Sequence, residues 1–95
     1  MQEKLKEKLI KVFSKYPEIK KVVLFGSRAR GDNKINSDVD LCIFGQIPHS
    51  VLAKIDMDIY ELDTALSFDI LCFNELSKKA LIENILNEGV ELYSE

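Results

Sequence analysis

Two aspartates separated by one apolar residue are the most informative chemical feature of this 95-residue chain. Asp38 and Asp40 belong to the segment SDVDL, residues 37–41. On a strand, positions i and i+2 project from the same face, so both carboxylates point the same way, ~6.5–7 Å apart along the backbone. Neighbouring carboxylates repel each other and resist burial, and a divalent cation such as Mg²⁺ relieves that cost. The pair predicts a metal site, with two solvated acids at a strand end as the alternative.

A glycine–serine pair precedes these acids at the end of an apolar run. Gly26 and Ser27 follow KVVLF, and they predict the corner where a buried strand meets a helical turn. A helix start presents free N–H groups and glycine permits close backbone approach, so such a corner suits phosphate. An ordinary serine-capped turn is the alternative. Together with the two acids, which follow after ten intervening residues, the corner favours a site for a metal-bound phosphate.

Asp69 is the third acidic element, within the apolar segment SFDILCF, residues 67–73. A carboxylate in an apolar strand needs a partner. If this strand neighbours that of Asp38 and Asp40, the three carboxylates suit a two-metal phosphoryl transfer, and Asp69 can also deprotonate an acceptor hydroxyl. The alternatives are an edge-strand acid paired with a lysine, and Asp63 as the third acid.

Alternating helical and strand patterns must position these residues. The patterns predict helices over roughly 2–16, 27–30 and 49–63 and a last one around 81–86, with strands at 19–25, 39–43 and 67–73. The order α-β-α-β-α-β-α predicts an α/β fold in which helices cover a sheet, and it leaves the strand directions open. Alternation in the tail, through Val90 and Leu92, is compatible with a further short edge strand.

The last helix has its own start, core and end signals. Asn74 or Ser77 is the expected N-cap and Gly89 the end signal. The expected core face is formed by Leu81, Ile82, Ile85 and Leu86.

Length and composition narrow the class of protein. Residues 1–95 are expected to form one domain, with 46% hydrophobic and 31% charged residues and a net charge of −3. A net negative charge disfavours broad electrostatic binding of nucleic acid. Neither a membrane span nor a signal peptide is expected from the apolar patterning, which predicts a cytoplasmic protein. Cys42 and Cys72 lie in apolar runs and are expected to be buried, reduced thiols.

The motifs GSRARG, residues 26–31, and SDVDL, residues 37–41, resemble those of the DNA polymerase β-like nucleotidyltransferase superfamily. The resemblance covers essentially the whole chain and is specific to the minimal nucleotidyltransferases. It implies a palm-like mixed β-sheet with flanking helices, and Mg²⁺, as two ions, on Asp38, Asp40 and Asp69. It also implies that Gly26 and Ser27 hold triphosphate oxygens. Arg28 is assigned to the nucleotide as well, because an arginine near a triphosphate suits phosphate contact. A solvated surface position or pairing with a partner is an equal alternative for each of Arg28, Arg30 and Lys34.

The same resemblance implies a substrate and a partner. Members transfer a nucleoside monophosphate from a nucleoside triphosphate to a hydroxyl, here AMP from ATP. Minimal members are often paired with a helical HEPN-type toxin and act as its antitoxin, some of them by adenylylating a tyrosine of that partner. A hetero-oligomer or a homo-oligomer is expected. Two alternatives remain: a binding module that neutralises the helical partner stoichiometrically, and a nucleotidyltransferase that acts on a small molecule.

Overall fold

A four-stranded mixed sheet forms the centre of the computed structural model, which describes residues 3–34 and 38–95. Its strands lie in the order β3-β2-β1-β4, so β3 and β4 are the edges. In chain order the elements are α1 (Glu3–Ser14), β1 (Lys21–Phe25), α2 (Ser27–Arg30), β2 (Val39–Phe44), α3 (His49–Tyr60), β3 (Phe68–Cys72), the 3₁₀ helix η1 (Phe73–Glu75), α4 (Lys79–Glu88) and β4 (Val90–Ser94). The predicted α/β architecture and the tail strand are confirmed.

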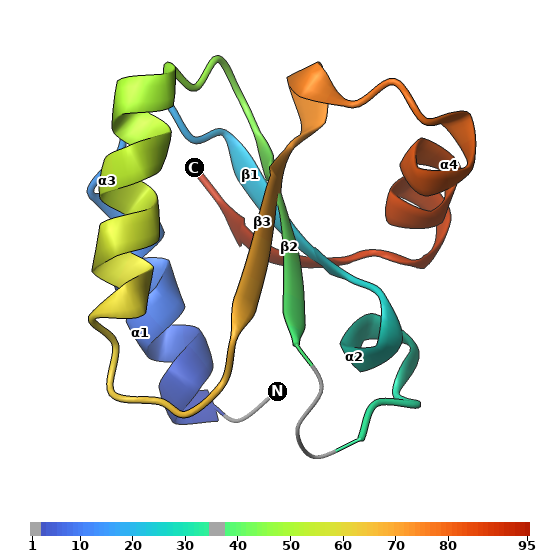
Figure 1. Ribbon diagram of the computed structural model, residues 1–95, viewed down its shortest axis with the longest axis horizontal. Helices are drawn as coiled ribbons and strands as arrows, with labels where there is room; N and C mark the ends of the chain where they lie inside the picture. The colour runs from blue at the N-terminus through green and yellow to red at the C-terminus, as the bar shows by residue number, and fades with distance from the viewer. Residues whose placement is uncertain (1–2, 35–37) are drawn as a thin grey trace.

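The strand directions, which periodicity leaves open, are mixed. β1 pairs antiparallel with both β2 and β4, whereas β2 and β3 are parallel. A parallel pair requires a long crossover, and α3 provides it between β2 and β3. Figure 1 shows α1 and α3 together on one side of the sheet and α2 and α4 on the other.

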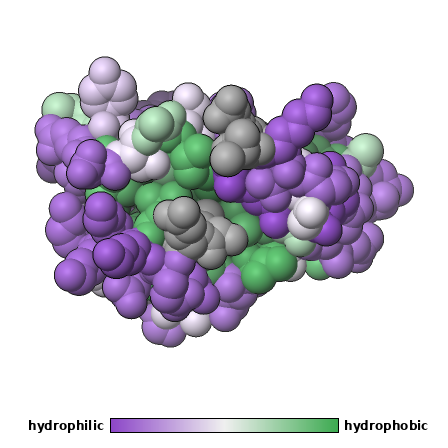
Figure 2. Space-filling view, turned by 90° about the horizontal axis from the view of Figure 1, so that it is seen from below, coloured by the Kyte–Doolittle hydropathy of each residue, from purple (hydrophilic) through white to green (hydrophobic). Residues whose placement is uncertain are grey.

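Two apolar clusters fill the space between the sheet and its helices. The larger lies between the sheet and the helices α1 and α3, around Phe13, Leu41 and Ile55, which are fully buried. The smaller joins α4 to the opposite face of the sheet through Ile85, Val23 and other residues of β1 and β2. Burial of each large apolar side chain contributes roughly 1.5–3 kcal/mol. In Figure 2, which looks at the end of the molecule where β2 begins, apolar residues gather in the centre between hydrophilic flanks.

Local sequence explains the first helix and its end. α1 lies within the predicted helix over residues 2–16, and four of its apolar residues are buried: Leu5, Leu9, Val12 and Phe13. The helix ends at Ser14, ahead of Pro17, since the residue before a proline disfavours the helical conformation. Buried positions fall every three or four residues, as one core-facing stripe requires.

The start of α4 differs from the prediction. Neither Asn74 nor Ser77 caps the helix, whose N-cap is Lys78. Asn74 lies instead in η1, where its Nδ2 donates a hydrogen bond to the Gly45 carbonyl oxygen at 3.0 Å. A tertiary partner therefore holds the side chain that was expected to cap the helix.

The exposed side and the end of α4 also differ from the prediction. Leu86 was expected in the core and is 60% exposed, because α4 covers only one part of the sheet and buries a narrow stripe around Ile85. Gly89 ends the helix at φ −66°, not in the left-handed conformation. A Cβ on Gly89 would lie 2.3 Å from both the Ile85 carbonyl oxygen and a Val23 methyl group, so close packing requires the glycine.

Within residues 3–34 and 38–95, no helix is long and apolar enough to cross a membrane.

Candidate functional site

Gly26 and Asp40 are packed against each other where β1 ends and β2 begins. Gly26 has φ 75° and ψ −156°, a combination that is essentially restricted to glycine. A Cβ at this position would lie 2.4 Å from Oδ2 of Asp40, well inside van der Waals contact. The glycine of the first motif therefore makes room for the central acid of the second, in addition to shaping the turn into α2.

Asp40 and Asp69 are neighbours across the sheet. They are direct partners in the parallel register of β2 and β3, and Phe25 is the partner of Asp40 on β1. Side chains opposite each other on adjacent strands share a face of the sheet. Cys42 and Leu71 follow Asp40 and Asp69 by two residues and therefore lie on that same face. They pack in one cluster with Ile85 of α4, so the two aspartates lie on the face that α2 and α4 flank. The predicted neighbourhood of the two strands is confirmed.

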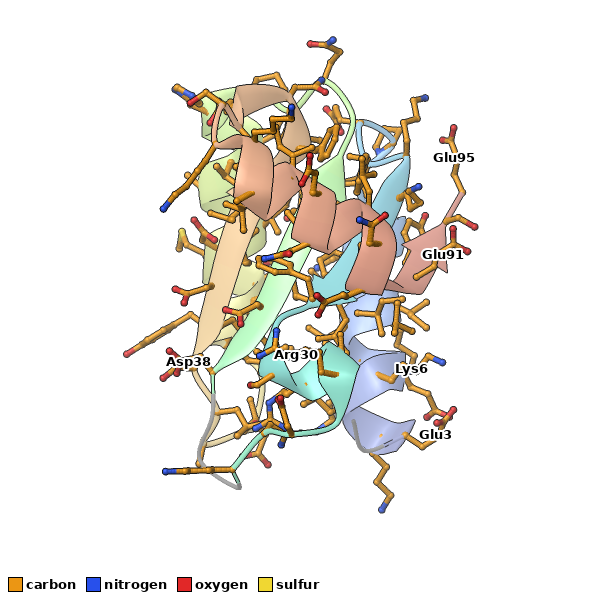
Figure 3. The ribbon with its side chains drawn as sticks, turned by 90° about the vertical axis from the view of Figure 1, so that its right-hand side faces the viewer. Glu3, Lys6, Arg30, Asp38, Glu91 and Glu95 are labelled. Carbon is orange, nitrogen blue, oxygen red and sulfur yellow. The ribbon has the colours of Figure 1, made fainter. Side chains whose placement is uncertain are left out.

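Asp38 stands at the edge of the same site. It comes one residue before β2 and is exposed, as Asp69 is, whereas Asp40 is half-buried. Figure 3 shows Asp38, at the start of β2, and Arg30, on α2, at the same end of the sheet. The serine that begins α2, Ser27, is half-buried beside Gly26. Lys34, in the loop after α2, is exposed. Residues 35–37, which include the serine of SDVDL, lie outside the described residues.

The electrostatics single out Asp40 among the three acids. Burial raises the pKa of the Asp40 carboxyl above its ordinary value, and the negative charges of Asp69 and Asp38 raise that pKa further. The positive charge of Arg30 opposes the shift. The chain thus gathers carboxylates around a half-buried one whose ionised form is disfavoured, which is the situation that a bound cation reverses.

Arg30 connects this site to α4. Its guanidinium pairs with Asp32 at 3.2 Å and with Glu88, the last residue of α4, at 3.6 Å. Glu88 carries no signal in the sequence, because no local motif links a residue at the end of α4 to one on α2. Arg28 precedes Arg30 on the same short helix and is half-buried.

The donor set fits a hard divalent cation, although the side chains do not form a closed cage. In the described part of the chain, no three His, Cys, Asp or Glu side chains are grouped closely enough to hold a metal ion. Mg²⁺ does not need such a cage, since it usually binds one or two carboxylates and completes its shell with water and substrate phosphates. The oxygen donors of Asp38, Asp40 and Asp69 are of the type that it prefers.

The two cysteines are confirmed as structural residues. Cys42 and Cys72 are free thiols and both are buried. Burial, and to a lesser extent the nearby Cys72, raises the pKa of the Cys42 thiol to about 12. A thiol with such a pKa stays protonated at neutral pH and is a poor nucleophile or metal ligand.

Comparison with protein families and curated proteins gives a consistent result. The family model for polymerase beta nucleotidyltransferases matches residues 7–95. Two candidate protein adenylyltransferases of Methanocaldococcus jannaschii are similar to the chain. MJ0604 is 38% identical over 94 residues, covering 93% of this chain and 78% of the relative. MJ0435 is 34% identical over 91 residues, covering 93% of this chain and 94% of the relative.

Solved structures show the same fold. A toxin–antitoxin crystal structure with AMP-PNP superimposes with a TM-score of 0.76 at 21% identity, covering 95% of this chain and 73% of that chain. A tri-AMPylated Shewanella oneidensis HEPN toxin in complex with its MNT antitoxin gives a TM-score of 0.71 at 19% identity, covering 100% and 74%. A candidate minimal nucleotidyltransferase gives 0.72 at 26% identity, covering 93% and 92%.

Proposed function

Because the chain belongs to the polymerase beta nucleotidyltransferase family, we propose that it transfers AMP from ATP to a hydroxyl of a partner protein. Nucleotidyl transfer is the activity of the family. The choice of AMP and of a protein acceptor is supported by the two relatives, which are named for protein adenylylation. The observation that carries the proposal is the contact of Gly26 with Asp40, because it joins the phosphate corner to the acid pair.

The chain's own residues divide the work of this reaction. Gly26 and Ser27 bind the phosphates, the glycine by permitting close approach of the backbone and the serine through its hydroxyl. Arg28 adds a positive charge for the triphosphate. The acceptor oxygen forms a bond to the α-phosphorus while the bond to pyrophosphate breaks, and the acceptor proton passes to Asp69.

Asp38, Asp40 and Asp69 would hold Mg²⁺ in this reaction. The bound ion supplies charge neutralisation for the phosphates and lowers the pKa of the attacking hydroxyl. Asp40 is the central ligand in this assignment, because Gly26 fixes its position and Asp69 lies opposite it. Half-burial of Asp40 keeps water from competing fully for its oxygens.

A HEPN-type toxin is the proposed partner, with a tyrosine as the acceptor. The Shewanella oneidensis complex, whose MNT antitoxin shares this fold, contains an AMPylated HEPN toxin. The chain would then act as the antitoxin of a hetero-oligomeric pair. We place this pair in the cytoplasm, where ATP is available and reducing conditions keep Cys42 and Cys72 as thiols.

Intact-mass spectrometry of a HEPN-type partner, after incubation with this chain, ATP and Mg²⁺, tests the proposal. We expect the partner to gain one or more AMP units and the gain to be lost with Asp40→Asn. Asp63→Asn is the matched control, because Asp63 is exposed in the loop after α3 and outside the site. A stable complex without any mass gain would favour stoichiometric neutralisation instead.

A further inference from the structure

The strand that carries Asp69 is an open edge of the sheet. Within the described residues, β3 has β2 on one side and no strand on the other. In Figure 1, β3 is the strand nearest the viewer, and no helix crosses in front of it. Asp69 is exposed, and its neighbours Phe68 and Ile70 are half-buried. An exposed edge presents unpaired N–H and C=O groups that can bind an extended segment.

The hydrogen bonding of β3 shows which of its backbone groups face outward. The Val39 N–H donates to the Ser67 carbonyl oxygen at 2.9 Å, so Ser67 directs its backbone toward β2. Backbone direction alternates along a strand. Asp69 and Leu71 therefore direct their backbone groups toward β2, and Phe68 and Ile70 direct theirs to the open edge.

An added strand would bring a side chain directly beside Asp69. The register of the sheet already forms a row in which Phe25, Asp40 and Asp69 lie side by side on three strands. A strand paired with Phe68 and Ile70 would extend this row. In an antiparallel pairing, Asp69 would belong to a non-hydrogen-bonded pair, in which the Cα atoms are ~4.5 Å apart and the side chains are closest.

A hollow on the opposite face of β3 would receive the alternating side chains of the same segment. It has a volume of about 760 Å³ and lies between α3, the loop that follows it and β3. Its apolar lining includes Ile59, Leu66, Phe68 and Ile70. At its rim Tyr60 is 91% exposed, and Met57 nearby is 63% exposed. Large apolar side chains held in water at one place are typical of a binding surface.

The acidic residues around this hollow indicate that the bound segment carries a basic residue. Asp56 lines it, and Glu61 lies beside Asp56 and Tyr60. Burial raises the pKa of the Asp56 carboxyl, and Asp56 has no basic residue among the lining residues. A lysine or arginine of the bound segment would supply the missing positive charge.

We propose that the acceptor protein pairs an extended segment with the outer edge of β3. A hydroxyl-bearing side chain of that segment lies beside Asp69. The adjacent residues of the segment, which are apolar or basic, place their side chains in the hollow against α3. This rests on the proposed function. The hydroxyl oxygen of that side chain bonds to the α-phosphorus of ATP, pyrophosphate leaves with the electron pair of the broken bond, and Asp69 takes the hydroxyl proton. Strand addition thus delivers the acceptor to the carboxylates through the edge of the sheet itself.

Amide hydrogen exchange of the whole ¹⁵N-labelled chain tests the docking edge separately from catalysis. The probes are capped nine-residue peptides with a central tyrosine. The residues one and three positions away from the tyrosine, whose side chains point to the opposite face of the strand, are apolar except for one lysine. The remaining positions carry mixed residues. We expect a bound peptide to slow exchange at the Phe68 and Ile70 amides at least tenfold. The Asp69 and Leu71 amides, already paired with β2, serve as internal controls and should keep their rates.

Backbone methylation of the peptide tests the pairing direction. The N–H groups of the two residues that flank the tyrosine would point to β3, and the N–H of the tyrosine itself would point away. We expect N-methylation at either flanking residue to abolish the protection and N-methylation of the tyrosine to preserve it. Equal effects at both kinds of position would overturn the proposal, as would the absence of protection by every peptide.

A charge reversal tests the hollow. Asp56→Lys should weaken binding of the lysine-containing peptides about tenfold, and Glu83→Lys, on the exposed side of α4, should leave it unchanged. Equal binding by the two variants would count against the hollow. AMP transfer to a HEPN-type partner without protection of Phe68 and Ile70 would overturn the docking edge and leave the proposed function intact. Protection without transfer to the tyrosine would support the edge and count against the proposed function.

Discussion

Replacement of Gly26 by alanine separates the two roles that the structure gives to this residue. The backbone conformation at φ 75° and ψ −156° costs a residue with a Cβ on the order of 1–3 kcal/mol. For a domain of this size, about 2 kcal/mol corresponds to a fall in Tm of roughly 8–16 °C. Gly26→Ala should therefore fold and melt clearly earlier than the wild type.

The larger effect of Gly26→Ala is expected on activity. The new methyl carbon would lie 2.4 Å from Oδ2 of Asp40, and the carboxylate must move by about 1 Å to restore normal contact. A displacement of this size at a reacting centre costs about 100-fold in rate. We expect the initial rate of AMP transfer, followed by intact mass at saturating ATP, to fall about 100-fold.

Gly31→Ala is the matched control for this experiment. Gly31 also has a positive φ, 84°, at the end of α2, so alanine there costs a similar ~1–2 kcal/mol. A Cβ at Gly31 would meet no described atom within 4 Å. Gly31→Ala should lower Tm and retain most of the activity. If the two variants lose activity equally, the contact between Gly26 and Asp40 does not position the acid and the reasoning fails.

Three further predictions follow from the same structure. Asp40→Asn should abolish transfer yet keep or raise Tm without Mg²⁺, because it removes a charge that burial and neighbouring acids disfavour; a Tm several degrees lower would contradict this. The Tyr16 hydroxyl donates a hydrogen bond to Asp58 and lowers the pKa of that carboxyl. The bond therefore stabilises the fold fully above pH ~4, and this stabilisation is lost as the pH falls through the pKa of Asp58 in the folded state. Tyr16→Phe should cost about 1 kcal/mol at pH 7 and show a smaller loss of Tm on acidification. Cys42 and Cys72 are buried, so a thiol reagent at pH 8 should modify them only at the rate of unfolding; rapid modification of the folded chain would contradict their burial.

The elements, and the acids that are candidates for the site, could be predicted because their signals are local. Buried positions three or four residues apart in α1, and the alternation through Val39, Leu41 and Ile43, reflect helical and strand geometry that neighbours along the chain impose. Asp38, Asp40 and the glycine–serine pair were recognisable for the same reason, since residue type and spacing within 15 residues suffice, whereas Asp69 lies in a separate segment. The position of Leu86 was predicted wrongly, because the width of a buried stripe depends on how much of the sheet α4 covers.

The sequence by itself determined which residues are candidates for the chemistry, and the tertiary structure decided how they meet. No local pattern specifies that Asp69 lies opposite Asp40, that Asn74 binds the Gly45 carbonyl or that Glu88 reaches Arg30. Strand order, direction and register depend on contacts between distant segments, and these are fixed only when both faces of the sheet are packed. The need for glycine at position 26 has the same origin: the turn can be read along the chain, but the carboxylate that would occupy the space of a Cβ comes from another strand.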